Sequence, residues 1–178
     1  GDETRPGVEE IWDIANTIRI AEMKAPPLLA VASDDAHTYH GEDVSPGRGW
    51  VMVGAEDLSG DAIITAMLAR KFYASSGVTL DGIRYDAATR TLSLDITPIE
   101  GVEYSTNFLG TRAGYDATAK ETGIGEVFAT LPGNQVSYIV PEDALYLRAT
   151  VTSSRKHPNP SFSGQHEQAW VQPVGWEK

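Results

Sequence analysis

The chain has no cysteine among its 178 residues. Disulfide bonds, thiolate nucleophiles and zinc–thiolate sites are therefore excluded together. No apolar run approaches the roughly 20 residues that a membrane-spanning helix needs, so we expect no membrane partner. Basic residues are scarce, with 14 Lys and Arg against 25 Asp and Glu and a net charge of −11. Because nucleic-acid binding usually requires a basic face, we expect no nucleic-acid partner.

What remains is the composition of an ordinary folded protein. Hydrophobic residues make up 41% and charged residues 22%, and the length fits one domain or two small ones. Any catalytic chemistry would have to use carboxylates or the four histidines, which are His37, His40, His157 and His166.

The first part of the chain predicts alternating helices and strands. Apolar residues at helical spacing predict an amphipathic helix over 7–23, and Pro26–Pro27 end it. Leu28–Ser33 is a continuous apolar run, typical of a buried strand in a parallel sheet. A second apolar run covers Trp50–Ala55, and Phe72–Ser75 is a third short strand.

A second helix is predicted over 60–71, with Ser59 as its N-cap. Its inner face would carry Ile63, Ile64, Met67 and Leu68.

From about residue 79 the pattern changes to alternating apolar and polar residues. Gly82–Tyr85 and Thr91–Thr97 flank a turn and predict a hairpin. Further alternating runs follow at 102–109, 126–131, 135–140, 145–152 and 168–174. Regularly spaced short strands without helices between them predict an antiparallel β-sandwich.

Asp35 and His37 form an Asp-x-His motif directly after the run Leu28–Ser33. In an extended segment both side chains point the same way, and a carboxylate with an imidazole suits zinc, manganese or iron. Loops beyond the carboxyl ends of parallel strands collect catalytic groups. His40 is a third candidate ligand. The alternative is that this common motif has no metal role.

Three stretches carry a family resemblance, and they are VASDDAH at 31–37, PGRGW at 46–50 and FYASSG at 72–77. They resemble the end of a PHP (polymerase and histidinol phosphatase) domain, and 146–152 with 169–173 resemble the β-domain that follows it in one branch. The predicted fold class is therefore α+β, with a partial α/β segment, PHP-barrel-like, over 1–78 and an antiparallel β-sandwich over 79–178.

The resemblance implies a metal-dependent phosphoesterase that hydrolyses phosphate esters through two or three divalent metals. Asp35 and His37 would be metal ligands. Arg48 would contact the anionic substrate or, alternatively, only shape its turn. The resemblance assigns no catalytic acid or base.

The family's earlier histidine ligands have no counterpart, because His37 is the first histidine of the chain. The sequence is therefore interpreted as the C-terminal part of such a protein, and we expect these 178 residues alone to be inactive.

Other interpretations stay open. The β-domain could make the chain a non-enzymatic binding module for a protein partner or a glycan. Alternatively, Asp35, His37 and His40 of two copies could complete a metal site by self-association. We also expect a homo-oligomer that covers the unpaired edge of Leu28–Ser33. The loop Arg155–Pro160 would either bind phosphate near the same site or remain solvated.

Overall fold

The computed structural model describes residues 5–37, 45–119 and 122–177. Its elements in chain order are α1 (Val8–Ala21), β1 (Trp50–Val53), α2 (Gly60–Leu68), β2 (Phe72–Ser75), β3 (Leu80–Asp86), β4 (Thr91–Ile96), β5 (Tyr104–Arg112), β6 (Glu126–Pro132), β7 (Gln135–Ile139), β8 (Ala144–Lys156) and β9 (His166–Val174).

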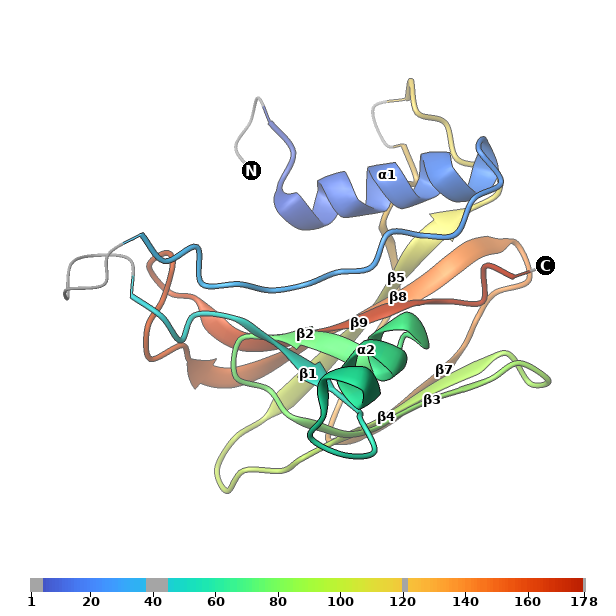
Figure 1. The fold of residues 1–178 in the computed structure, drawn as a ribbon. Coiled ribbons are helices and arrows are strands. Elements are labelled where there is room, and N and C mark those ends of the chain that lie inside the picture. Colours follow the sequence, from blue (N-terminus) through green and yellow to red (C-terminus); the bar gives the residue numbers. More distant parts are fainter. Residues whose placement is uncertain (1–4, 38–44, 120–121, 178) are drawn as a thin grey trace.

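The strands form two sheets. One has six strands in the order β1-β2-β9-β8-β5-β6, and the other has three in the order β3-β4-β7. Every strand pairing in the described part of the chain is antiparallel. Figure 1 shows α1 lying along the six-stranded sheet, on the side away from β3 and β4.

The core lies between the two sheets. Along β4, Leu92, Leu94 and Ile96 are buried while the residues between them are half-exposed, which is the period of a strand with one face on a core. The strand β8 faces them with Leu147, Ala149 and Val151, all fully buried. Each buried leucine contributes about 2 kcal/mol relative to an exposed one.

The antiparallel β-sandwich predicted from the alternating pattern is confirmed, including the hairpin of β3 and β4. The predicted α/β, PHP-barrel-like segment is wrong. The runs at Trp50–Val53 and Phe72–Ser75 pair with each other antiparallel, and β2 pairs with β9 of the sandwich. A continuous apolar run occurs in parallel and in antiparallel sheets, here in the buried strand β2 and in the partly exposed edge strand β1, so it did not distinguish the two kinds of pairing. The division of the chain at residue 78 stays a prediction.

The run Leu28–Ser33 is extended but pairs with no described strand. Leu28 and Val31 are 46% and 64% exposed, so the predicted buried parallel strand is wrong here. Side chains, not a neighbouring strand, hold its backbone. Gln172 of β9 both donates to the carbonyl of Ala30 and accepts from its N–H, each at 2.8 Å.

Polar contacts dock α1 on the sheet. Arg148 of β8 is 1% exposed and binds Asp13 through two bonds, from Nε to Oδ1 at 2.7 Å and from Nη2 to Oδ2 at 2.6 Å. Tyr146 donates to Asp13 Oδ1 at 2.8 Å, and Glu9 accepts from Arg148 Nη1 at 3.1 Å. Burial alone would lower the pKa of Arg148, but the hydrogen bonds and charge of Asp13 raise it. The guanidinium therefore stays charged beneath α1.

The same helix orders the segment that follows it. Asn16 accepts from the N–H of Leu28 at 2.7 Å, and Trp12 Nε1 donates to the carbonyl of Leu28 at 2.9 Å. Figure 1 shows this segment, in blue, running back along α1. It delivers residues 34–37 to one end of the sandwich.

The helix α2 begins at its predicted cap, because Ser59 Oγ accepts from the N–H of Ala62 at 3.2 Å. Its inner face is narrower than predicted, since Ile64 and Leu68 are 58% and 81% exposed. Within the described residues, no helix combines the length and apolarity needed to cross a membrane.

Candidate metal and phosphate site

Asp34 fixes the shape of the candidate site. Its Oδ1 accepts from the backbone N–H groups of Gly47 at 2.9 Å, Arg48 at 2.6 Å and Gly49 at 2.9 Å. Hydrogen bonds from Gly49, Gly47 and Arg48 hold the pKa of the Asp34 carboxyl below its ordinary value of 3.8. The charged carboxylate of Asp34 thus closes the turn at 46–49, so Asp34 has a structural role.

Backbone conformation favours glycine at one place in this turn, and close packing favours it at another. Gly47 has a φ of +94°, a conformation that side chains rarely adopt. A Cβ on Gly49 would lie 3.1 Å from Cβ of Ala32 and 3.3 Å from the carbonyl oxygen of Ser33. The turn therefore packs directly on the segment that carries the Asp-x-His motif.

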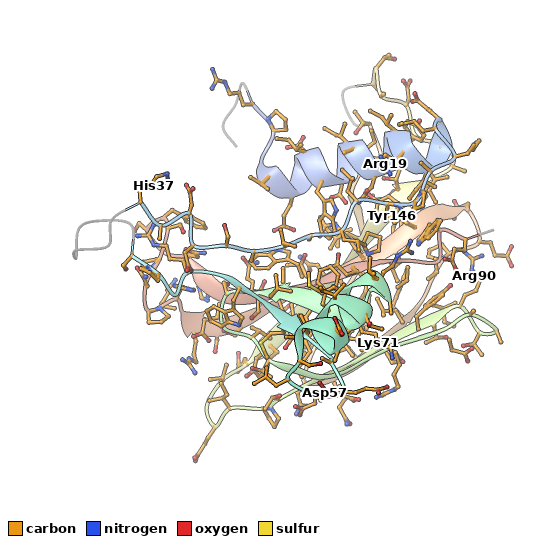
Figure 2. All side chains as sticks on the ribbon, viewed as in Figure 1. Arg19, His37, Asp57, Lys71, Arg90 and Tyr146 are labelled. Atoms are coloured by element: carbon orange, nitrogen blue, oxygen red, sulfur yellow. The ribbon has the colours of Figure 1, made fainter. Side chains whose placement is uncertain are left out.

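Asp35 and His37 project from this fixed segment. Their side chains are 88% and 73% exposed, and His37 Nε2 lies 3.8 Å from Asp35 Oδ1. Asp35 has a φ of +50°, so the segment is not a regular strand at this point. The structure nevertheless brings the two predicted ligands together, and Figure 2 shows His37 at the edge of the molecule.

Arg48 lies in the turn at 46–49, and contacts with Asp34 and Asn159 hold it. Its backbone binds Asp34, and its Nε donates to Oδ1 of Asn159 at 3.3 Å. The guanidinium is therefore oriented by the loop between β8 and β9. His40, the third predicted ligand, lies outside the described residues.

The sequence did not predict which residues the loop between β8 and β9 contacts. Asn159 Nδ2 lies within hydrogen-bonding distance of Ser45 Oγ at 2.8 Å and of the carbonyl oxygens of Pro46 and Ser45 at 3.1 and 3.3 Å. Its backbone N–H donates to Nδ1 of His157, which is 4% exposed. This loop is therefore joined to the turn, although the described residues show no hydrogen bond or ion pair between it and Asp35 or His37.

The donor set fits part of a metal site. Two donors that each bind a metal at about 2.1 Å with a tetrahedral angle lie about 3.4 Å apart, close to the 3.8 Å that separates the two side chains. Within the described ranges there is no group of three or more His, Cys, Asp or Glu side chains that could hold a metal. Asp35 and His37 thus offer two donor groups, fewer than a stable metal site needs.

No protein-family model, curated protein or solved structure matches this chain. The function is therefore argued from the geometry of these residues.

Proposed function

We propose that this chain takes part in metal-dependent hydrolysis of phosphate esters, with Asp35 and His37 as ligands of a divalent metal such as zinc, manganese or iron. The observation that carries the proposal is the pair itself. A carboxylate and an imidazole stand 3.8 Å apart, exposed, on a segment that Asp34 fixes. Carboxylate oxygen with imidazole nitrogen is a donor set for these metals.

A divalent metal held there would supply Lewis acidity, polarising a phosphate ester and acidifying water. The residues of the chain would do the remaining work. The guanidinium of Arg48, oriented by Asn159, offers the planar donors that bind phosphate oxygens. With two described ligands, where catalytic zinc sites use three, we expect weak metal binding and no turnover by these 178 residues alone.

Paramagnetic line broadening tests the metal site. Mn²⁺ added to the full 178-residue chain should broaden the NMR signals of the His37 imidazole and of the Asp35 backbone first. Asp35→Asn and His37→Ala should each remove this broadening. Asp57→Asn is the matched control, because Asp57 is an exposed aspartate that Figure 2 shows well away from His37.

Broadening that survives in both variants, or that Asp57→Asn removes equally, would contradict the proposed ligands. Turnover of a simple phosphate ester that His37→Ala abolishes would support the function and show that the ligand count is too low.

The alternative of a binding module is favoured by a groove of about 790 Å³ at one end of the sandwich. Its polar lining includes Glu103, Ser105, Asn134, Thr152, Ser154 and His166. Hydroxyl, amide and carboxylate groups are the partners that sugar hydroxyls need. Saturation-transfer NMR with simple glycosides tests this candidate. Glycoside binding that Glu103→Gln weakens would favour the binding module over the first candidate.

A further inference from the structure

The loop between β8 and β9 contains a buried histidine whose protonation state is fixed by its partner. His157 is 4% exposed, and its Nδ1 accepts from the backbone N–H of Asn159 at 3.0 Å. Because an N–H group can only donate, Nδ1 carries no proton, and the neutral imidazole has its proton on Nε2. A second proton would have to enter at Nδ1, where it would displace the N–H of Asn159.

Two prolines make this hydrogen bond important for the loop. Pro158 and Pro160 flank Asn159, and proline has no N–H, so Asn159 supplies the only backbone donor of this Pro-Asn-Pro segment. The backbone of His157 is held separately, because its N–H donates to the carbonyl of Gln165 at 2.9 Å. Loss of the bond to Nδ1 therefore removes the one backbone hydrogen bond that the segment donates.

The charged groups around the loop do not favour a cation at His157. Besides His166, those on the adjoining elements are Arg155, Lys156, Glu167, Asp34, Asp35 and Arg48. Glu167 already pairs with Arg155 at 2.9 Å, Asp34 accepts from the turn, and Asp35 is 88% exposed. Among the described residues, no carboxylate is hydrogen-bonded to the His157 ring. Protonation would thus place a cation in a buried position and turn Nδ1 into a donor that faces another donor.

We propose that His157 is a pH-sensitive clasp, which holds the β8–β9 loop closed while its imidazole is neutral and releases the loop when it is protonated. Histidine is the side chain whose ordinary titration range, about pH 5 to 8, includes neutral pH. We therefore expect the loop to be closed at the upper end of this range and open at the lower end. The clasp needs no metal, so it goes beyond the proposed function and does not depend on it.

Opening of the clasp acts on Arg48 through Asn159. The Asn159 side chain contacts Ser45, Pro46 and Arg48, so a shift of its backbone withdraws these contacts. Asp34 stays charged in the same range, because its pKa lies below 3.8. The turn at 46–49 therefore keeps its own hydrogen bonds, and the change is confined to the loop and to the orientation of the Arg48 guanidinium.

His166, at the start of β9, offers a comparison within the same loop. Its Nδ1 lies 2.8 Å from the carbonyl oxygen of Ser153, which can only accept, so its Nε2 is the nitrogen without a proton and accepts from Lys156 Nζ at 2.8 Å. The ring is only half-buried, and its partner is an exposed, flexible side chain. Protonation of His166 therefore displaces Lys156 and leaves the loop closed.

Ring ¹⁵N NMR and hydrogen exchange of the full, metal-free chain test the clasp. At about pH 8 we expect a proton on Nε2 of His157 and on Nδ1 of His166. Between about pH 8 and about pH 5, His157 should gain its second proton. The protection of the Asn159 amide, corrected for the intrinsic exchange rate at each pH, should then fall roughly tenfold. Amides of the central strand β4 should keep their protection.

Two variants separate the clasp from other effects of acid. His157→Asn keeps an acceptor near the position of Nδ1 but does not titrate, so Asn159 should stay protected at about pH 5. His166→Gln is the matched control, because it removes the other histidine of the loop and keeps an acceptor for Lys156. It should leave the loss of protection as it is in the wild type.

The wild-type measurements decide the proposal even where a variant does not fold. A proton on Nδ1 of His157 at about pH 8, or equal protection of Asn159 at both ends of the range, would overturn it. Opening that persists in His157→Asn, or that His166→Gln abolishes, would overturn it as well, because the pH dependence would then belong to another group.

Discussion

Asn159 joins the β8–β9 loop to the turn that carries Arg48. Its side chain contacts Ser45, Pro46 and Arg48, which are more than 100 positions away in sequence. The residues around Asn159 in the sequence do not predict these contacts. The contacts depend on where the pairing of β8 with β9 places the loop between them. The Asp-x-His motif, in contrast, was visible as a motif because both residues lie within three positions of each other.

Replacing Asn159 should loosen the turn. Asn159→Ala removes all of its side-chain hydrogen bonds, so we expect local opening at residues 45–49 to become easier by about 1–2 kcal/mol. Asn159→Asp is the matched variant, since it keeps an acceptor for Arg48 but loses the donor to Ser45 and Pro46. Hydrogen exchange of the Gly47 and Gly49 amides measures the opening. Equal protection in the wild type and in Asn159→Ala would show that the loop does not hold the turn.

Asp34 gives the turn a pH dependence. The pKa of the Asp34 carboxyl is lowered in the folded chain. Its contribution to the stability of the turn is therefore complete above pH 3.8, and it is lost as the pH falls through the pKa of the folded state. The amide shifts of Gly47, Arg48 and Gly49 should therefore titrate with a midpoint below 3.8. Asp34→Asn should abolish this transition. A midpoint at or above 3.8 would mean that the three hydrogen bonds do not stabilise the charged form.

At the scale of elements, the apolar periodicity of α1 predicts a helix but not the face by which the helix packs. The spacing of Val8, Ile11, Ala15 and Ile18 predicted a helix, and the helix is there. It did not predict which face docks, because the outer face of β8 offers the buried cation Arg148 instead of apolar side chains. The acidic residues of α1 pair with that cation, and this interaction decides the orientation.

Breaking this pair should undock the helix. Asp13→Ala leaves the guanidinium of Arg148 buried without its bidentate partner, and we expect a loss of about 3–5 kcal/mol in the free energy of unfolding. The double variant Asp13→Leu with Arg148→Met should recover much of this loss, because no buried charge remains unpaired. Urea denaturation measures both. A loss below about 1 kcal/mol for Asp13→Ala would show that the pair does not hold α1.

At the scale of the whole molecule, the sandwich was predictable where one face of a strand is covered and the other is open. The alternation at Thr91–Thr97 is such a case, and β4 forms there. The fully buried strand β2 and the partly exposed edge strand β1 gave no such signal. The runs at Trp50–Val53 and Phe72–Ser75 were assigned to an α/β layer, although they extend the six-stranded sheet through β9. That pairing joins segments about 100 positions apart, which local patterns do not encode.

We propose that Asp35 and His37 bind a metal that recruits phosphate. The most direct measurement is the ³¹P relaxation rate of inorganic phosphate in the presence of the chain and Mn²⁺. We predict a relaxation enhancement, beyond that of Mn²⁺ alone, that Asp35→Asn and His37→Ala abolish, Arg48→Gln reduces, and Asp57→Asn leaves unchanged. The same enhancement in the Asp35→Asn and His37→Ala variants as in the wild type would contradict the account.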